Sequence, residues 1–360
     1  MRSTWRILWR FFFSALFLFS NLPIITITSN DGSVFLNKIA VCNFEIGYRI
    51  AVTNSTAFVS DNSGVMFIDI TSPTRPSVIT HFDTGDTTFG VVVKDDVLFV
   101  AAGSQGLFIV DVSSPESPQL LGRFASSEIA STFAIHDNYG FLGYMGSASI
   151  SVLNLTDLSS PSFLTGISGY DCNQLLSYED FLFGASPDAG LVVFNISNPV
   201  NPTFIRSLNA LGGHDISIGD DRLFLGCHVY GLKTFNCTNP SAVTPLTTVS
   251  QDDDGEAQGV VYTAGFLCVA DNFGVELFNI TNPYSTTKID EFRQGISAAH
   301  DIAANGNYVF VAKGSGLGVF EISNTKSAYF PPFLYYVIPI STILIIGLGL
   351  LLFLRRKKRK

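Results

Sequence analysis

The sequence contains seven copies of one short motif at a nearly constant spacing. One copy reads GLFIVDVSSPESP from Gly106: an apolar run, an acid, two hydroxyl residues and two prolines. The other copies begin at Gly64, Ser149, Gly190, Gly231, Gly274 and Gly316, so that successive copies start 41 to 43 residues apart. Self-similarity at a fixed period indicates a repeat architecture, in which each copy is one unit that packs against its neighbours.

Each unit has the pattern of four short β-strands. Apolar runs such as VLFVAA and GLFIV are separated by turns rich in Gly, Asn and Asp, as expected for strands and tight turns. A core column, with one residue per unit, lies upstream of the motif at Phe58, Phe99, Phe141, Phe183, Phe224, Cys268 and Phe310. Four short strands in a unit of this length are typical of a propeller blade. We therefore predict an all-β, seven-bladed β-propeller of four-stranded blades over residues 30–326.

The last blade is incomplete in its own unit. The seventh copy stops at Asn324, before a fourth strand, whereas the segment FLNKIAVCNF at residues 35–44 precedes the first blade and has the pattern of a strand. An N-terminal strand that completes the last blade closes the ring and removes an exposed sheet edge. We expect residues 35–44 to take that place.

The polar part of the motif is interpreted as a turn device. An acid or amide follows the apolar run, and a hydroxyl residue follows two positions later in every copy, as in Asp111 and Ser113. Such side chains bond nearby backbone groups and stabilise turns, and proline prevents the strand from continuing. The motif is therefore no indication of catalysis.

These repeats resemble the LVIVD-repeat family of cell-surface β-propellers. The resemblance rests on the GLFIVDVSSPESP type of motif with its upstream VLFVAAGSQG, and it covers roughly residues 35–324. It implies the propeller fold and a cell-surface location. The third copy has Ser where Gly is usual, and the seventh lacks the proline turn.

The two ends of the chain predict export and a membrane anchor. Residues 1–29 have a basic start, an apolar middle and a polar exit, as in a signal peptide or an uncleaved anchor. Residues 334–354 are 21 uncharged residues, long enough for a transmembrane helix. Residues 327–333 are read as a linker, and the basic residues 355–360 as a cytoplasmic tail. We expect a single-pass protein of the cell membrane with the propeller outside.

Charge and cysteine content narrow the function classes. Without the two ends, the chain has 12 basic and 30 acidic residues, a net charge of −18. A surface this acidic argues against nucleic acid as a partner and favours cations or basic ligands. Five irregularly spaced cysteines show no zinc pattern, and the sequence identifies no disulfide pair.

The residues that begin each first strand are predicted to surround one mouth of the central channel. This head column consists of Tyr48, Phe89, Ser131, Asn173, His214, Gln258 and His300. The column that follows it consists of Arg49, Gly90, Thr132, Gln174, Asp215, Gly259 and Asp301. Imidazole and carboxylate ligands suit divalent cations, so His214, Asp215, His300 and Asp301 are candidate metal ligands, together with Asp252, Asp253 and Asp254 in a nearby loop. The alternative is that these polar groups only solvate the mouth.

Five N-x-S/T sequons predict N-glycosylation sites at Asn54, Asn154, Asn195, Asn236 and Asn279. The last four are the amide residues of the repeated motif. Their role in the turn accounts for asparagine at these positions without glycosylation.

A rigid ring with variable loops favours a non-catalytic binding or adhesion module for an extracellular protein or carbohydrate. No catalytic residue is identified, and the patterns GxSxG, HExxH and Walker A are absent. The alternatives are an exported enzyme with a metal or substrate site at the channel mouth, and a structural element of the cell envelope.

Overall fold

The computed structural model describes residues 26–28, 33–249, 255–293 and 298–327. The chain divides into two compact units, one formed by Val34–Ser323 and the other by the two ends of the chain. Within the second unit, strand β1 (Thr26–Thr28) pairs antiparallel with β30 (Thr325–Ser327). The predicted transmembrane segment at residues 334–354 lies outside the described residues, and none of the described helices is long and apolar enough to span a bilayer.

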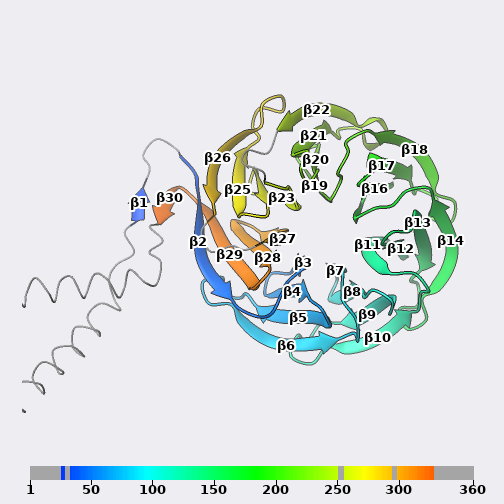
Figure 1. Ribbon diagram of the computed structural model, residues 1–360. Helices are drawn as coiled ribbons and strands as arrows, with labels where there is room; N and C mark the ends of the chain where they lie inside the picture. The colour runs from blue at the N-terminus through cyan, green and yellow to red at the C-terminus, as the bar shows by residue number, and fades with distance from the viewer. Residues whose placement is uncertain (1–25, 29–32, 250–254, 294–297, 328–360) are drawn as a thin grey trace, which may run out of the picture. The chain divides into compact units, whose positions relative to one another are not determined.

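The Val34–Ser323 unit is a ring of seven four-stranded antiparallel sheets, which confirms the predicted propeller (Figure 1). In the first six blades, the strands run outward from the channel in chain order. Blades one to three contain β3 (Ile50–Val52), β4 (Thr56–Ser60), β5 (Gly64–Asp69), β6 (Ser77–Asp83), β7 (Gly90–Lys94), β8 (Val97–Ala101), β9 (Leu107–Asp111), β10 (Gln119–Phe124), β11 (Ala130–His136), β12 (Tyr139–Tyr144), β13 (Ser149–Asn154) and β14 (Ser162–Ser168).

The other four blades follow the same plan. Blades four to seven contain β15 (Gln174–Tyr178), β16 (Phe181–Ser186), β17 (Gly190–Asn195), β18 (Thr203–Leu208), β19 (Asp215–Gly219), β20 (Arg222–Gly226), β21 (Leu232–Asn236), β22 (Thr244–Val249), β23 (Gly259–Thr263), β24 (Phe266–Ala270), β25 (Val275–Asn279), β26 (Thr287–Phe292), β27 (Ala299–Asn305), β28 (Tyr308–Lys313) and β29 (Gly316–Ser323). In blade five, a 3-10 helix (Pro240–Ala242) precedes the outer strand.

Strand β2 (Phe35–Cys42) closes the ring, as predicted from residues 35–44. It pairs antiparallel with β29 and supplies the outer strand of blade seven. Leu36 is buried among core residues of blades six and seven, and its backbone N–H donates to Asp290 in blade six. The first described strand of the ring therefore holds together the last two blades.

The core column and the turn device behave as the repeat pattern predicts. All seven members of the core column are buried, including Cys268 in place of phenylalanine. In six of the seven copies the acid or amide accepts a hydrogen bond from the backbone N–H two residues on, for example from Ser113 to Asp111 at 2.8 Å.

The outer strand of every blade contains a β-bulge that the sequence analysis did not predict. Its register against the third strand shifts by one residue in each of the seven sheets. In blade two the extra residue is Leu121, between the paired Leu120 and Gly122. A bulge bends a strand and increases its twist, so that the outer strands can follow the curved rim.

The antiparallel pairing defines two faces of the ring. At one end of the channel, which we call the mouth face, the first strand of each blade begins. The turns between second and third strands lie at the same end. The turns after first and third strands lie at the other end, the far face. Phe35 pairs with Ser323 at the end of β29, so the ring's own first and last strands begin and end at the far face. All five sequons lie in far-face turns or at the strand ends beside them.

Candidate functional site

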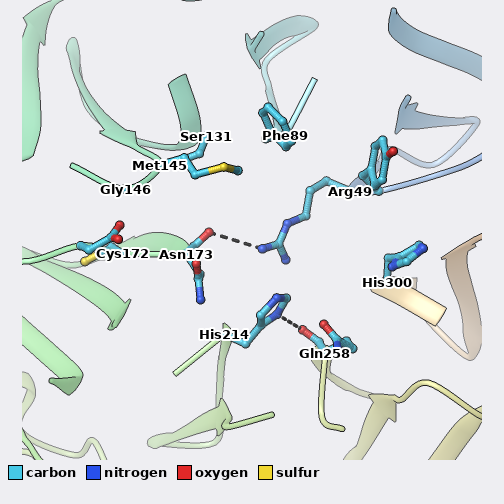
Figure 2. Close-up of a pocket in the computed structure, with 12 residues that line it drawn as sticks. Arg49, Phe89, Ser131, Met145, Gly146, Cys172, Asn173, His214, Gln258 and His300 are labelled. Carbon is cyan, nitrogen blue, oxygen red and sulfur yellow. Dashed lines mark hydrogen bonds between the residues drawn. The ribbon is translucent and has the colours of Figure 1, made fainter. Parts of the chain in front are cut away.

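A pocket of about 210 Å3 lies at the mouth of the central channel. All seven members of the head column line it, so each blade contributes at least one side chain. The remaining lining residues are Arg49, Met145, Gly146, Asp171 and Cys172. Since first strands converge on the axis, residues far apart in the chain meet here (Figure 2).

Arg49 is the central cation of this pocket. Its side chain extends into the middle of the pocket, with the guanidinium directed toward Asn173 (Figure 2). Nη2 donates to the carbonyl oxygen of Asn173 at 3.3 Å, and Nη1 lies 3.8 Å from Oδ1 of Asp301. Nη1 is buried and has no hydrogen-bond partner within the described part of the chain. The guanidinium therefore has unused donor capacity.

The two histidines of the pocket are neutral at physiological pH. Burial and the charge of Arg49 lower the pKa of His214 to about 3, and the same causes lower the pKa of His300. Nδ1 of His214 lies 2.6 Å from the carbonyl oxygen of Gln258, so the proton of the neutral ring resides on Nδ1. Neither imidazole adds positive charge near pH 7.

Asp215 and Asp301 connect neighbouring blades. Oδ2 of Asp215 accepts a hydrogen bond from the backbone N–H of Val260 at 2.7 Å, and Oδ2 of Asp301 accepts one from Ile50 at 2.9 Å. Thr132 accepts from Leu175 in the same way at 3.0 Å. The innermost strand of a blade is a sheet edge with unpaired backbone donors, and a buried donor without a partner is costly. These side chains cap the next blade.

Glycine occupies the same column where the next blade lies closer. A Cβ on Gly90 would lie 2.8 Å from the carbonyl oxygen of Ser131, and a Cβ on Gly259 would lie 3.0 Å from Cα of Asp301. The first distance is shorter than real Cβ contacts, and the second is tighter than most of them, so a side chain at either position would press on the backbone of the next blade. At five of its seven positions, the column after the heads is thus an inter-blade contact, made either through a capping side chain or by direct backbone approach.

The predicted metal ligands are only partly brought together. His214 and His300 both line the pocket, whereas the carboxylates of Asp215 and Asp301 are engaged between blades. Asp252, Asp253 and Asp254 lie outside the described residues. Among the residues that are described, no group of three or more His, Cys, Asp or Glu side chains is placed to hold a metal ion. A divalent cation at the mouth stays a prediction.

The charge at the centre of the pocket opposes a cation. Two unit charges 4 Å apart interact by roughly 4 kcal/mol at an effective dielectric constant of 20. A divalent ion beside the guanidinium of Arg49 would be repelled about twice as strongly, so a cation site would need a position away from this residue.

Several lining groups come from loops and were not singled out from the sequence. Met145 and Gly146 lie in the turn after β12, and Asp171 and Cys172 lie in the connection to β15. Burial raises the pKa of Cys172 to about 12, with a smaller contribution from Asp171, so this thiol is not an activated nucleophile. All five cysteines are buried free thiols.

Exposed apolar side chains lie in the loops of the mouth face. They belong to the connections before first strands and the turns between second and third strands: Ile129, Met145, Leu211, Val229, Tyr230 and Phe273. Nearby, His228 has partners that the sequence did not reveal, with Nε2 3.3 Å from Oε2 of Glu256. We call the six apolar residues the mouth rim. A polar pocket within an apolar rim is typical of a recognition surface.

Comparison with known proteins identifies the repeat. The sequence matches the LVIVD repeat at residues 48–84, 85–126, 169–210 and 297–329. This chain carries four LVIVD repeats, a family of β-propeller repeats. The matches fall on blades one, two, four and seven of the LVIVD propeller, whereas blades three, five and six have the same four strands without a match.

Solved structures similar to this LVIVD propeller share its fold at low sequence identity. The RRP9 WD40 repeats have a TM-score of 0.65 and 10% identity, over 83% of this chain and 100% of that chain. BamB from Moraxella catarrhalis has a TM-score of 0.58 and 11% identity, over 79% and 97%. The computationally designed Ika8 protein has a TM-score of 0.58 and 10% identity, over 79% and 99%. A search of curated proteins found no match.

Proposed function

We propose that this chain is a membrane-anchored, cell-surface binding module that recognises an extracellular protein or carbohydrate through its mouth face. The observation that carries the proposal is the mouth pocket, which is lined by residues of all seven blades and lies on the same face as the mouth rim. A rigid scaffold that presents variable loop residues around one concave site suits recognition.

The direction of the chain ends supports this orientation. The ring's first and last strands begin and end at the far face, because Phe35 pairs with Ser323. The chain therefore leaves the last strand of the ring at the face opposite the mouth pocket. The five sequons share the far face, so glycans there would leave the pocket accessible.

We expect the ring to be outside the cell and the basic tail inside. On intact cells, protease added externally should digest the ring of the full chain and spare a tag placed after Lys360. In a glycosylating host, peptide N-glycosidase should reduce the apparent mass, and changing Asn54, Asn154, Asn195, Asn236 and Asn279 to Gln should remove that shift. A protected ring, or a tag that is cleaved on intact cells, would contradict the proposed topology.

We expect partners to contact the mouth rim rather than the outer strands. A photo-crosslinking amino acid at Tyr230, which is 51% exposed, should give a larger cross-linked species on intact cells. The matched control is Phe163 on outer strand β14, which is similarly exposed at 56%. Both positions carry an exposed aromatic side chain, so a difference in cross-linking between them reports the location of the partner. Cross-linking from Phe163 only, or from neither position, would overturn the assignment of the binding face.

A further inference from the structure

We propose that the mouth pocket binds the carboxylate of a small organic monoacid, with the guanidinium of Arg49 as its ionic partner. The proposal deepens the binding function above and rests on it for the choice of face. It differs from the cation expected from the sequence because the charge at the centre of the pocket is positive.

Arg49 has an ionic neighbour in Asp301, but its Nη1 lacks a hydrogen-bonded acceptor within the described residues. The side chain is only 13% exposed, yet Nη1 has no hydrogen-bond partner within the described residues, and its nearest carboxylate oxygen, on Asp301, is 3.8 Å away. The bond from Nη2 to the carbonyl oxygen of Asn173 is 3.3 Å long. A carboxylate accepts two parallel N–H bonds from one edge of a guanidinium, which satisfies donors that a single carbonyl cannot.

The other charges near the pocket select a monoanion. Asp171 lines the same pocket, and Asp301 lies beside the guanidinium. His214 and His300 are neutral near pH 7, because burial and Arg49 lower the pKa of each. One guanidinium can balance one carboxylate, whereas a dianion such as phosphate would bring a second charge toward these acids.

The rest of the wall suits an apolar, planar ligand body. The ring of Tyr48 lies 6.5 Å from that of Phe89 and 5.8 Å from that of His300, measured between centroids. Met145 adds a flexible apolar side chain on the opposite side of Arg49 from His300 (Figure 2). The pocket volume of about 210 Å3 is far larger than the roughly 10–15 Å3 that one ordered water occupies by the same measure. The site therefore has room for an aromatic acid and not only for an ion.

The test is a titration of benzoate into the purified full chain in detergent, with benzamide as the uncharged isostere. We expect benzoate to bind with a dissociation constant on the order of 1 mM or tighter, and benzamide not to bind. The substitution Arg49→Gln should abolish binding, and Arg75→Gln, at an exposed turn on the far face, should leave it unchanged. No benzoate binding to the unaltered chain, or equal binding of benzamide, would overturn the proposal.

A second variant controls for the possibility that Arg49→Gln loses binding only because the protein fails to fold. Arg49→Lys keeps the charge beside Asp301 and loses the two-pronged geometry, so binding should weaken about 5- to 10-fold with an unchanged melting temperature. Benzoate binding that is unaffected by Arg49→Lys and Arg49→Gln in folded protein would place the ligand elsewhere and refute the assignment.

Two further comparisons extend the test. The first distinguishes a polypeptide C-terminus from a free acid as the ligand, and the second distinguishes failure of the carboxylate site from failure of the proposed binding function. A short peptide with a free C-terminus that binds more tightly than benzoate, and loses binding when amidated, would identify a polypeptide end as the ligand. Tighter binding of benzoate would identify a free acid; both results support the carboxylate site. If benzoate fails while Tyr230 still cross-links a partner on cells, the carboxylate site is refuted and the binding module stands.

Discussion

Replacing strand β2 (Phe35–Cys42) by a Gly-Ser segment of equal length should unfold the ring or leave it only marginally stable. The change removes seven residue pairs with β29 and the burial of Leu36 and Cys42. At about 1 kcal/mol for the net hydrogen bonding of each pair and about 1.5–3 kcal/mol per buried apolar side chain, the loss is roughly 10–13 kcal/mol. Domains are stable by only about 5–15 kcal/mol, so the loss is comparable with the whole free energy of unfolding.

Thermal unfolding of the full chain, followed by circular dichroism, measures this effect. Equal length in the replaced segment separates the loss of the strand from a shortened connection. A synthetic peptide of residues 34–43, added in trans, should restore part of the lost stability, because it can pair with the free edge of β29. A Gly-Ser variant that melts within a few degrees of the parent would show that the ring does not depend on this closure.

The closure and the blades were predictable because every repeat obeys the same local rules. The spacing of the motif located the third strands, the core column located the buried second strands, and the missing last strand directed attention to residues 35–44. The bulges were missed because a register shift is a property of two strands together. A signal was nevertheless present: an aliphatic residue, such as Ile79 or Leu121, occurs at the bulge of each blade.

The position of the candidate site was predictable from the sequence, whereas the contacts of its side chains were not. The head column was placed correctly at the mouth because each strand must start there. In the column behind it, Asp215 and Asp301 were interpreted as candidate metal ligands, since each adjoins a histidine in the sequence. A carboxylate that caps a backbone N–H and one that binds a metal have the same sequence signal, and only the distance to the next blade separates them. The contact of Arg49 with Asn173 was likewise not predictable, because it joins residues of blades one and four that are far apart in the sequence.

The buried pair Asp215 and Asp301 should make stability depend on pH, and Asp215→Asn should remove most of that dependence. Burial and the charge of Asp301 raise the pKa of Asp215 to about 7, whereas an aspartate in the unfolded chain titrates near 3.9. Between these values the folded state holds a proton that the unfolded state has released. The contribution of this group is therefore present at about pH 4 and is lost as the pH rises to about 7.

The measurement is the free energy of unfolding of the variant minus that of the parent, from pH 4 to pH 9. Taking the difference cancels groups with the opposite trend, such as His214, whose lowered pKa removes stability as the pH falls. We expect a difference near zero at pH 4 and a gain of up to roughly 4 kcal/mol for Asp215→Asn at pH 9, at 1.36 kcal/mol per pKa unit.

A second substitution separates the charge of Asp215 from its hydrogen bond. Asparagine keeps an oxygen that accepts from the backbone N–H of Val260, whereas Asp215→Ala leaves that donor buried without a partner. The alanine variant should therefore be about 1–3 kcal/mol less stable than the asparagine variant at every pH. Asp83→Asn, at an exposed position in blade one, is the control and should leave the profile of the parent unchanged. Parallel profiles for the parent and Asp215→Asn would mean that Asp215 is already ionised in the folded protein across this range, and the capping role would then rest on the alanine variant alone.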